Sequence, residues 1–298
     1  MVDSYRIGVD GGGTKTELVL LDAAGSIVTQ HIAPGCNPNV VGQEQARAVL
    51  LEALGQIHRE PVSTTQLYMS GAPDFWREFA EGLRDFGRVS TANDSLPVLE
   101  LATHGEPGMV LHGGTGSFVA ARDLHHDLHY AGGLGWRFGD PGSGYDLGRR
   151  AISRGLLELQ GWAPATRVGQ LIRDHGESIG ISTTSDLTRY FYQNSAPNKI
   201  IASLAPAVLH LASEGDESCI QMVLDSAEPL VEIAVRVATR LFPQTPLDEI
   251  PCGLTGPVMT HPVVAEMLIP RTPLPLKRIT EAPIEGVHQL LIRTTVGA

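Results

Sequence analysis

The chain has 298 residues, of which 42% are hydrophobic and 18% charged, a composition typical of a globular protein with a sizeable core. Its 22 basic and 33 acidic residues give a net charge of −11, which argues against nucleic acid or an anionic membrane as the main partner. Residues 1–7 are too short and polar for a signal peptide, and no apolar run approaches the roughly 18 residues of a membrane span. Three widely separated cysteines (Cys36, Cys219 and Cys252) fit neither a disulfide framework nor a zinc site, so we expect a cytoplasmic protein.

The first hundred residues alternate strand and helix patterns. The spacing of apolar residues predicts strands over residues 6–10, 17–22, 26–33, 66–70 and 87–92. It predicts helices over residues 43–59, 74–86 and 96–103. This half of the chain is therefore expected to be a mixed α/β domain.

The second half opens like the first. Residues 109–123 repeat the strand, glycine turn and strand of residues 7–22, which indicates a weak internal repeat. Helices are then predicted over residues 146–159, 164–175, 185–193, 199–213 and 216–241, and Pro229 is expected to kink or split the last of them. A strand, turn and helix over residues 250–268 and a terminal helix over 284–292 complete the prediction.

A run of three glycines, Gly11-Gly12-Gly13, joins the first two predicted strands. Backbone N–H groups can converge on an anion there without interference from Cβ atoms. A Walker loop would carry Lys where Thr14 stands and would be followed by a helix, whereas a strand follows here. We interpret the run as a hairpin phosphate loop, framed by Asp10 as a candidate metal ligand and Thr14 as a phosphate-binding hydroxyl, against the alternative of a purely structural turn.

Two further glycine-rich turns follow. Gly113-Gly114-Thr115-Gly116-Ser117 repeats the first loop in the second half of the chain, and residues 139–144 precede a predicted helix. Each has a structural alternative, a plain turn for the first and a turn with a helix N-cap for the second. As a pair, the two hairpin loops are expected to grip successive phosphates of a nucleotide.

Two other patterns resemble functional motifs but are better explained by local structure. Residues 176–180 fit the G-x-S-x-G pattern of α/β-hydrolases, but a helix precedes them where that motif requires a strand, and Gly176 is expected to be that helix's C-terminal cap. His125, His126 and His129 stand at an expected hairpin turn, which favours a solvated turn over a metal site.

Five segments in order resemble a known family: IGVDGGGTKT, TANDS, HGGTGS, GGLGWRFGDPGSGYDLG and GLTGP. They resemble the N-acetylglucosamine kinase and BadF/BadG/BcrA/BcrD ATPase family of the sugar kinase, Hsp70 and actin superfamily, from Arg6 to about Gly286. The resemblance implies an α/β fold of two ribonuclease-H-like (actin-like ATPase) domains with an interdomain cleft. One would comprise residues 1–108 rejoined by 284–298, the other residues 109–283. It also implies ATP and Mg²⁺ as cofactors, a small-molecule sugar as substrate, and a homodimer.

The resemblance assigns roles residue by residue. Asp10 would organise Mg²⁺, and Asp94 would be the catalytic base. ATP would be held by Gly11, Gly12, Gly13, Thr14, Lys15, Gly114, Thr115, Gly116 and Gly256. The sugar would be held by Asn37, Gly71, Asp94, Trp136, Gly139 and Asp140. Asp94 also stands where a strand ends and a helix begins, so its plain alternative is a helix cap.

Three positions depart from the family pattern. Pro141 replaces the usual Glu, Pro257 replaces the second glycine of the adenosine motif, and Val287 replaces an alanine. The phosphate-loop and base positions are intact, so we predict an ATP-dependent kinase of N-acetyl-D-glucosamine or D-glucosamine with altered specificity. One alternative is an ATPase that activates a dehydratase or reductase through an iron–sulfur cluster, which the scattered cysteines disfavour. The other is a non-catalytic sugar sensor, which the retained Asp94 disfavours.

Overall fold

The computed structural model describes residues 4–293, which form two compact units. The first contains the chain up to His104 together with the segment from Glu281 onward, and the second contains Gly105–Thr280. These divisions fall a few residues before the predicted boundaries at 108/109 and 283/284.

The first unit is built on a five-stranded mixed sheet of order β3-β2-β1-β4-β5. Its strands are β1 (Tyr5–Gly11), β2 (Lys15–Leu21), β3 (Ile27–Pro34), β4 (Val62–Met69) and β5 (Arg88–Asn93). β1, β2 and β3 form an antiparallel meander, whereas β1, β4 and β5 are parallel. The carboxyl ends of these three parallel strands therefore lie at one edge of the sheet.

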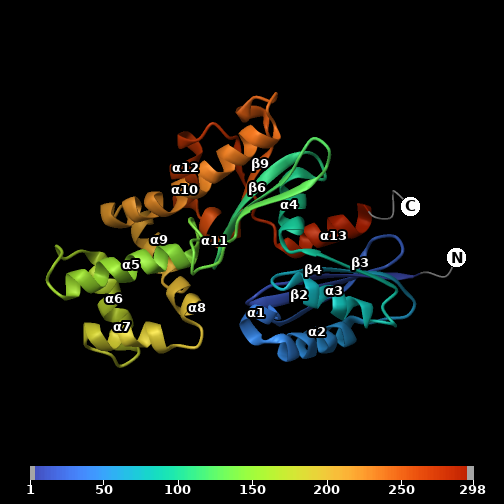
Figure 1. Ribbon diagram of the computed structural model, residues 1–298, viewed down its shortest axis with the longest axis horizontal. Coiled ribbons are helices and arrows are strands. Elements are labelled where there is room, and N and C mark those ends of the chain that lie inside the picture. Colours follow the sequence, from blue (N-terminus) through green and yellow to red (C-terminus); the bar gives the residue numbers. More distant parts are fainter. Residues whose placement is uncertain (1–3, 294–298) are drawn as a thin grey trace. The chain divides into compact units, whose positions relative to one another are not determined.

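Helices cover both faces of this sheet (Figure 1). They are α1 (Pro38–Val41), α2 (Gln43–Ile57), α3 (Pro73–Glu81), α4 (Ser95–Thr103) and α13 (Pro283–Arg293). The strands are apolar on both sides: Val9 and Leu18 pack in one core with α2 and α3, and Val19 and Leu21 pack in another with α13. A sheet buried on both faces presents its chemistry only at its strand ends.

The second unit repeats this topology. Its sheet has the order β10-β9-β6-β7-β8, with strands β6 (Gly108–Gly113), β7 (Ser117–Arg122), β8 (Leu128–Gly132), β9 (Cys252–Thr255) and β10 (Leu276–Arg278). β6 and β7 form the antiparallel hairpin, and β6, β9 and β10 are parallel. Each strand thus has a counterpart in the first unit, and β6–β7 corresponds to β1–β2, as the internal repeat predicts.

The rest of the second unit is helical. Its helices are α5 (Gly144–Leu159), α6 (Arg167–Ser178), α7 (Thr184–Gln193), α8 (Pro197–Ala202), α9 (Ala205–Ser213), α10 (Glu217–Leu241), α11 (Gly256–Met259) and α12 (Pro262–Leu268). Short 3₁₀ turns lie at Leu247–Glu249 and Ile269–Arg271. Apolar side chains of these helices and of the sheet form a single large core.

Pro229 does not split α10, contrary to the prediction. Proline lacks the N–H that would bond the carbonyl four residues earlier, that of Asp225. The guanidinium of Arg150 donates to this carbonyl at 3.0 Å. A side chain from α5 thus replaces the missing backbone bond, and the helix continues to Leu241.

Three other helix predictions were wrong in detail. The helix predicted over 199–213 is two helices, α8 and α9, because Pro206 in the first turn of α9 starts a new helix. The helix predicted over 74–86 ends at Glu81, before Gly82. Gly176 lies inside α6 instead of capping it, and Gly180, with φ +74°, is the left-handed residue after the helix.

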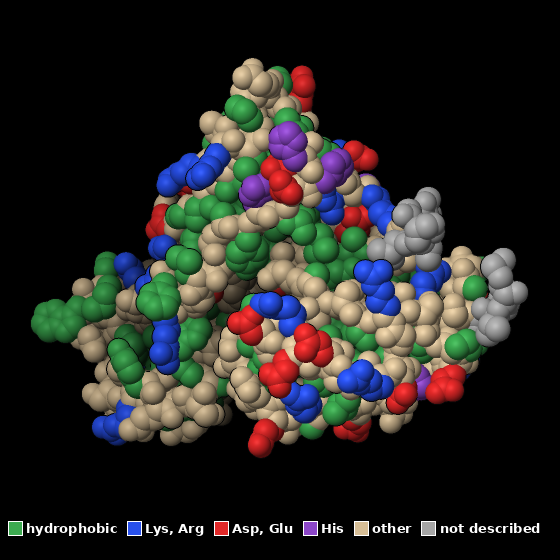
Figure 2. Space-filling view, turned by 45° about the vertical axis from the view of Figure 1, so that its right-hand side comes forward, with side chains coloured by type: hydrophobic (Ala, Val, Ile, Leu, Met, Phe, Trp, Pro, Cys, Tyr) green, Lys and Arg blue, Asp and Glu red, His purple; other side chains and the backbone are tan. Residues whose placement is uncertain are grey.

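The surface carries mixed charge. Acidic and basic side chains are interspersed over the face shown in Figure 2. Within residues 4–293 no helix combines the length and the apolar character needed to cross a bilayer. His125 and His126 are exposed in the expected solvated turn, whereas His129, also exposed, lies on β8, where its Nε2 contacts Asp123 at 2.8 Å.

An ion pair ties α13 to α4 and yields a stability prediction. Arg293 Nε lies 2.8 Å from Oε1 of Glu100, whose side chain is fully buried. Arg293→Ala takes the guanidinium away from a buried carboxylate, so we expect the free energy of unfolding to fall by about 3 kcal/mol in urea titrations. Arg236→Ala is the control, because its ion pair with Glu232 is exposed and should contribute less than about 1 kcal/mol. Equal small losses in both variants would contradict the assignment.

Candidate functional site

The predicted first phosphate loop is a braced turn between β1 and β2. The Gly12 N–H donates to the Lys15 carbonyl at 3.0 Å, which closes the turn. The segment after β3 holds the turn by two further backbone bonds. The Gly35 N–H donates to the Thr14 carbonyl and the Cys36 N–H donates to the Gly12 carbonyl, each at 3.1 Å. Thr14 and Lys15 are exposed. The turn is thus held by backbone bonds while its outer residues face solvent, the arrangement that an anion-binding loop requires.

Asp10 and Asp94 lie at the ends of strands in the same parallel set. Asp10 pairs with Glu17 across the hairpin and with Tyr68 on β4, and Asp94 directly follows β5. Burial is the largest cause that raises the pKa of Asp10, to about 7, and the charges of Asp94 and Glu17 raise it further. Lys15 acts in the opposite direction, but its ammonium also pairs with Glu17 at 2.6 Å. Two mutually repelling carboxylates are therefore concentrated at this edge of the sheet.

The Asp94 side chain is not the cap of α4. Asp94 occupies the N-cap position with no capping bond from its side chain, and the Oδ1 of Asn93 accepts from the Ser95 N–H at 2.9 Å instead. Burial raises the pKa of Asp94 to about 6, against the opposing effect of a bond from its own backbone N–H. The plain alternative for Asp94 is therefore wrong, and its carboxylate is available for another role.

Asn37 and Gly71 lie next to each other in the first unit. Asn37 caps α1, because its Oδ1 accepts from the Asn39 N–H at 2.9 Å. Gly71 follows β4 with φ +68°, and a Cβ atom on it would lie 2.4 Å from the Asn37 Oδ1. Only glycine fits this conformation and this approach. The carbonyl oxygen of the Asn37 amide is already engaged, which leaves its NH₂ group as the part suited to a ligand.

The residues at this edge suit Mg²⁺ bound together with a phosphate ligand. Within the described residues no group of three or more His, Cys, Asp or Glu side chains forms a ready metal site. Mg²⁺ typically takes one or two carboxylates and completes its shell with water and substrate phosphates. The raised pKa of Asp10 shows that its negative charge is poorly compensated in the protein alone, and a cation beside it would relieve that cost.

In the second unit, the loop between β6 and β7 is held by the segment before α5. The Gly114 N–H donates to the Gly116 carbonyl at 2.9 Å, and the Gly144 N–H donates to the Gly114 carbonyl at 2.7 Å. Gly256, after β9, has φ +81°, and a Cβ atom on it would lie 2.5 Å from the Gly113 carbonyl oxygen. The predicted phosphate loop and the predicted adenosine glycine are thus in direct contact.

Asp140 belongs to the same cluster. It is buried, has φ +76°, and its Oδ1 accepts from the Gly135 N–H at 3.2 Å. Its Oδ2 would lie 2.9 Å from a Cβ atom on Gly116, and burial raises its pKa. Neighbouring Gly139 is exposed. Asp140 therefore helps to hold its own loop beside the second phosphate loop.

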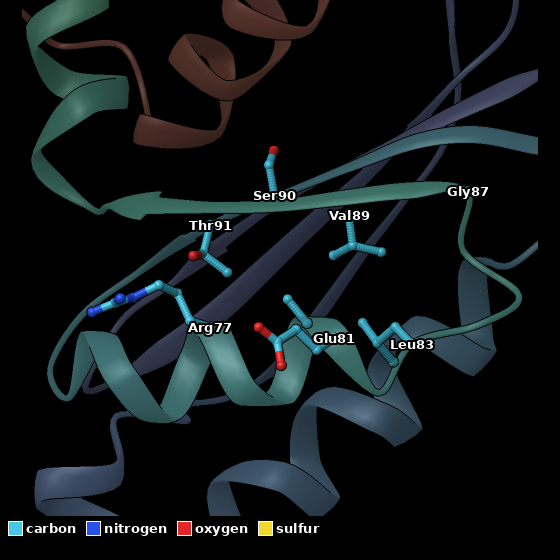
Figure 3. A pocket seen from close by; sticks show the side chains of 8 residues that line it. Arg77, Glu81, Leu83, Gly87, Val89, Ser90 and Thr91 are labelled. Atoms are coloured by element: carbon cyan, nitrogen blue, oxygen red, sulfur yellow. The ribbon is translucent and has the colours of Figure 1, made fainter.

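Trp136 lies in a different environment from Asp140. It lines a hollow of about 440 Å³ together with Tyr145, Ile152, Leu156 and Phe191, and its ring centroid is 5.5 Å from that of Tyr145. Another hollow, of about 410 Å³, lies between α3 and β5 in the first unit (Figure 3). Val89 and Thr91 point toward α3 there, while Ser90 points to the other side of the strand. This hollow contains none of the predicted site residues.

Sequence reasoning missed two residues beside these loops. Glu17 is the buried partner of Lys15, and its charge raises the pKa of Asp10. The sequence could have indicated it, because pairing of the two predicted strands as a hairpin places an acidic residue opposite Asp10. His112 stands directly before the second glycine run and contacts Thr255 on β9. Nothing in the local sequence indicated that contact, because it depends on the pairing of β6 with β9.

The comparisons with known proteins agree on one group of relatives. A model of the BadF/BadG/BcrA/BcrD ATPase family matches residues 7–271. The chain is 27% identical over 258 residues to an N-acetyl-D-glucosamine kinase of Dictyostelium discoideum, covering 79% of each chain. It is 27% identical over 237 residues to an N-acetylmuramic acid/N-acetylglucosamine kinase of Clostridium acetobutylicum, covering 76% of each. A solved structure of a candidate N-acetylglucosamine kinase from Chromobacterium violaceum is 26% identical, with a TM-score of 0.79 over 97% of this chain and 99% of that one. The predicted two-domain α/β fold is thereby confirmed.

The coupling of Asp10 and Asp94 is directly measurable. Asp94→Asn removes a negative charge that raises the pKa of Asp10, so that pKa should fall from about 7 in carboxyl ¹³C NMR titrations of the ligand-free protein. Asp74→Asn, on the exposed surface of α3, should leave the Asp10 titration unchanged. The same Asp10 midpoint in wild type and Asp94→Asn would show that the two carboxylates do not interact.

Proposed function

This chain belongs to the BadF/BadG/BcrA/BcrD ATPase family, and we propose that it is a sugar kinase specific for amino sugars. The acceptor we propose is N-acetyl-D-glucosamine, with D-glucosamine as the alternative. The observation that carries the proposal is the Asp94 carboxylate, which is partly buried, makes no capping bond and follows a strand parallel to the one that carries Asp10. The relatives named above act on N-acetylglucosamine, which supports the same acceptor here.

Asp94 would act as the general base. Its pKa of about 6 makes it mostly ionised at neutral pH, yet more basic than an ordinary aspartate. As the sugar hydroxyl oxygen bonds to the γ-phosphorus, Asp94 takes the hydroxyl proton. The bond from the γ-phosphorus to its bridging oxygen breaks, and ADP leaves. Such a transfer depends on positioning and charge neutralisation more than on covalent chemistry by the protein.

The glycine loops would hold the nucleotide. In the first unit, the turn formed by Gly11, Gly12, Gly13 and Thr14 would bind phosphate through its N–H groups, with Lys15 beside it. In the second unit, Gly114, Thr115 and Gly116 would bind phosphate, and Gly256 would lie against the adenosine. Asp10 would hold Mg²⁺ that arrives with ATP, and this Mg²⁺ would neutralise phosphate charge. The exposed Thr14 and Lys15 and the poorly compensated Asp10 support this part of the proposal.

Sugar-side residues are proposed in each unit by itself. In the first unit, the NH₂ group of Asn37 would donate to the sugar beside Gly71, since the Asn37 Oδ1 is occupied as a cap. In the second unit we assign Trp136, Gly139 and Asp140 to the sugar side on the strength of the family motif. A homodimer, which the family resemblance implies, remains a prediction.

The alternatives have less support. An iron–sulfur ATPase activator needs thiolates grouped for a cluster. Here all three cysteines are buried, and they lie in separate segments: Cys36 between β3 and α1, Cys219 in α10 and Cys252 in β9. Burial raises the pKa of the Cys36 thiol, which disfavours the thiolate that a cluster needs. A sugar sensor would not need a carboxylate base, whereas Asp94 is present and makes no structural capping bond.

The base assignment is tested with Asp94→Asn. Asparagine keeps the shape but cannot accept a proton, so kcat for sugar phosphorylation should fall about 10²-fold or more while ATP affinity and stability change little. Steady-state kinetics and urea unfolding measure these quantities. Asn93→Ala is the matched control: it removes the actual cap of α4, so stability should fall by about 1 kcal/mol while kcat stays near wild type. A near wild-type kcat in Asp94→Asn would refute the assignment.

The sugar assignment is tested with Asn37→Asp. Aspartate caps a helix as well as asparagine does, so α1 should be preserved while the NH₂ donor is lost. We expect the KM for the sugar to rise by about tenfold or more and the KM for ATP to stay within about twofold, in line with the loss of one buried hydrogen bond. Asn194→Asp makes the same change at a similar turn in the second unit and should alter neither KM. Equal rises in both KM values would make Asn37 a structural residue.

A further inference from the structure

His112 is held on two sides by neighbouring strands. It pairs in register with Thr255 on the parallel strand β9 and with Phe118 on the antiparallel strand β7. Its Nδ1 and the Thr255 Oγ1 are 3.1 Å apart, and its ring stacks on Phe118 with centroids 4.7 Å apart and planes at 13°. Phe118 in turn stacks on Tyr130 at 5.1 Å. The imidazole is therefore fixed in both position and orientation.

The Nε2 and Cε1 atoms of the ring lie next to two glycines from different loops. A Cβ atom on Gly114, in the second phosphate loop, would lie 3.0 Å from Nε2 of His112. A Cβ atom on Gly256, in the turn after β9, would lie 2.9 Å from Cε1. The ring thus lies beside the direct contact of Gly113 with Gly256 and supports both loops from one side.

The chemistry of His112 and Thr255 suits a rigid support beside the two loops. Burial lowers the pKa of His112 to about 4, so the ring is neutral at pH 7 and adds no charge beside the loop. A hydroxyl both donates and accepts, so Thr255 can complete the bond with either ring tautomer. Thr255 stands at the N-cap position of α11 without making a side-chain capping bond there. Its hydroxyl is committed to His112 instead.

We propose that His112 is a positioning residue of the nucleotide site, which fixes the second phosphate loop at Gly114 relative to the turn at Gly256. This inference rests on the proposed function, in which these two glycines bind the phosphates and the adenosine of ATP. His112 acts through the loops. Thr255 holds the ring by its hydrogen bond, and Phe118 holds it by stacking.

The test compares variants that lose the His112 ring, variants that lose only its hydrogen bond to Thr255, and a variant that loses both. His112→Ala removes the ring that lies beside both glycines, so we expect the KM for ATP and the directly measured Kd for ATP to rise about tenfold or more, with the KM for the sugar unchanged. His112→Phe keeps a stacked ring but loses the bond, and Thr255→Val loses the same bond. Both should raise the ATP constants by a similar, smaller factor of about threefold to fivefold. In the double variant His112→Ala/Thr255→Val the effect should equal that of His112→Ala alone, because the bond is already absent.

Controls separate this role from general destabilisation. His125→Ala, in the exposed turn of the same unit, should change none of these constants. Urea unfolding identifies any variant that is not folded, and the kinetics of His112→Phe still test the proposal if His112→Ala fails to fold. Unchanged ATP constants in the folded His112 variants, or equal rises in the ATP and sugar KM values, would overturn the proposal.

Direct ATP binding by isothermal titration calorimetry distinguishes this proposal from the proposed function. If the wild-type protein binds ATP but phosphorylates no sugar, the proposed function fails, and weaker ATP binding in His112→Ala still supports the positioning role. If the wild-type protein does not bind ATP, both are overturned.

Discussion

The parallel pairing of β1, β4 and β5 decides where the charge of the first unit is concentrated. It brings the ends of these strands to one edge of the sheet, so that Asp10 and Asp94 interact although they are far apart in sequence. Both carboxylates are partly buried, and Lys15, whose charge lowers the pKa of Asp10, also pairs with Glu17. The protein alone therefore compensates this charge poorly. A ligand that brings its own cation would offset the repulsion, which explains how a chain with a net charge of −11 can be expected to bind a triphosphate.

Much of this arrangement could be predicted from local sequence. A Walker loop would have Lys at position 14, where this chain has Thr, and a strand instead of a helix follows the glycine run. Both features indicated a hairpin loop, and β1 and β2 form an antiparallel hairpin. What local sequence could not supply was the set of contacts that depend on tertiary pairing. His112 and Thr255 are 143 positions apart and meet only because β6 pairs with β9. Likewise, the continuity of α10 through Pro229 depends on Arg150, which lies on another helix.

The departures from the family pattern fit the structure without local conflict. Pro257 stands in the first turn of α11, where a backbone N–H would have no helical partner and proline is well tolerated. The carbonyl of Pro141 accepts from the Ser117 hydroxyl at 2.6 Å, which joins its loop to the start of β7. Both prolines thus stiffen turns that lie beside the second phosphate loop. We expect them to influence which sugar or nucleotide is accepted more than whether the transfer occurs.

As a proposed amino sugar kinase, the protein would couple ATP cleavage to transfer of the phosphoryl group to the sugar. The most direct measurement is ³¹P NMR of one reaction containing the protein, ATP, Mg²⁺ and N-acetyl-D-glucosamine, with a parallel reaction that lacks the sugar. A sugar kinase should form one sugar phosphate for each ADP, and almost no ADP when the sugar is left out. Equal release of ADP and inorganic phosphate with and without the sugar, and no sugar phosphate, would rule out this coupling and favour an ATPase.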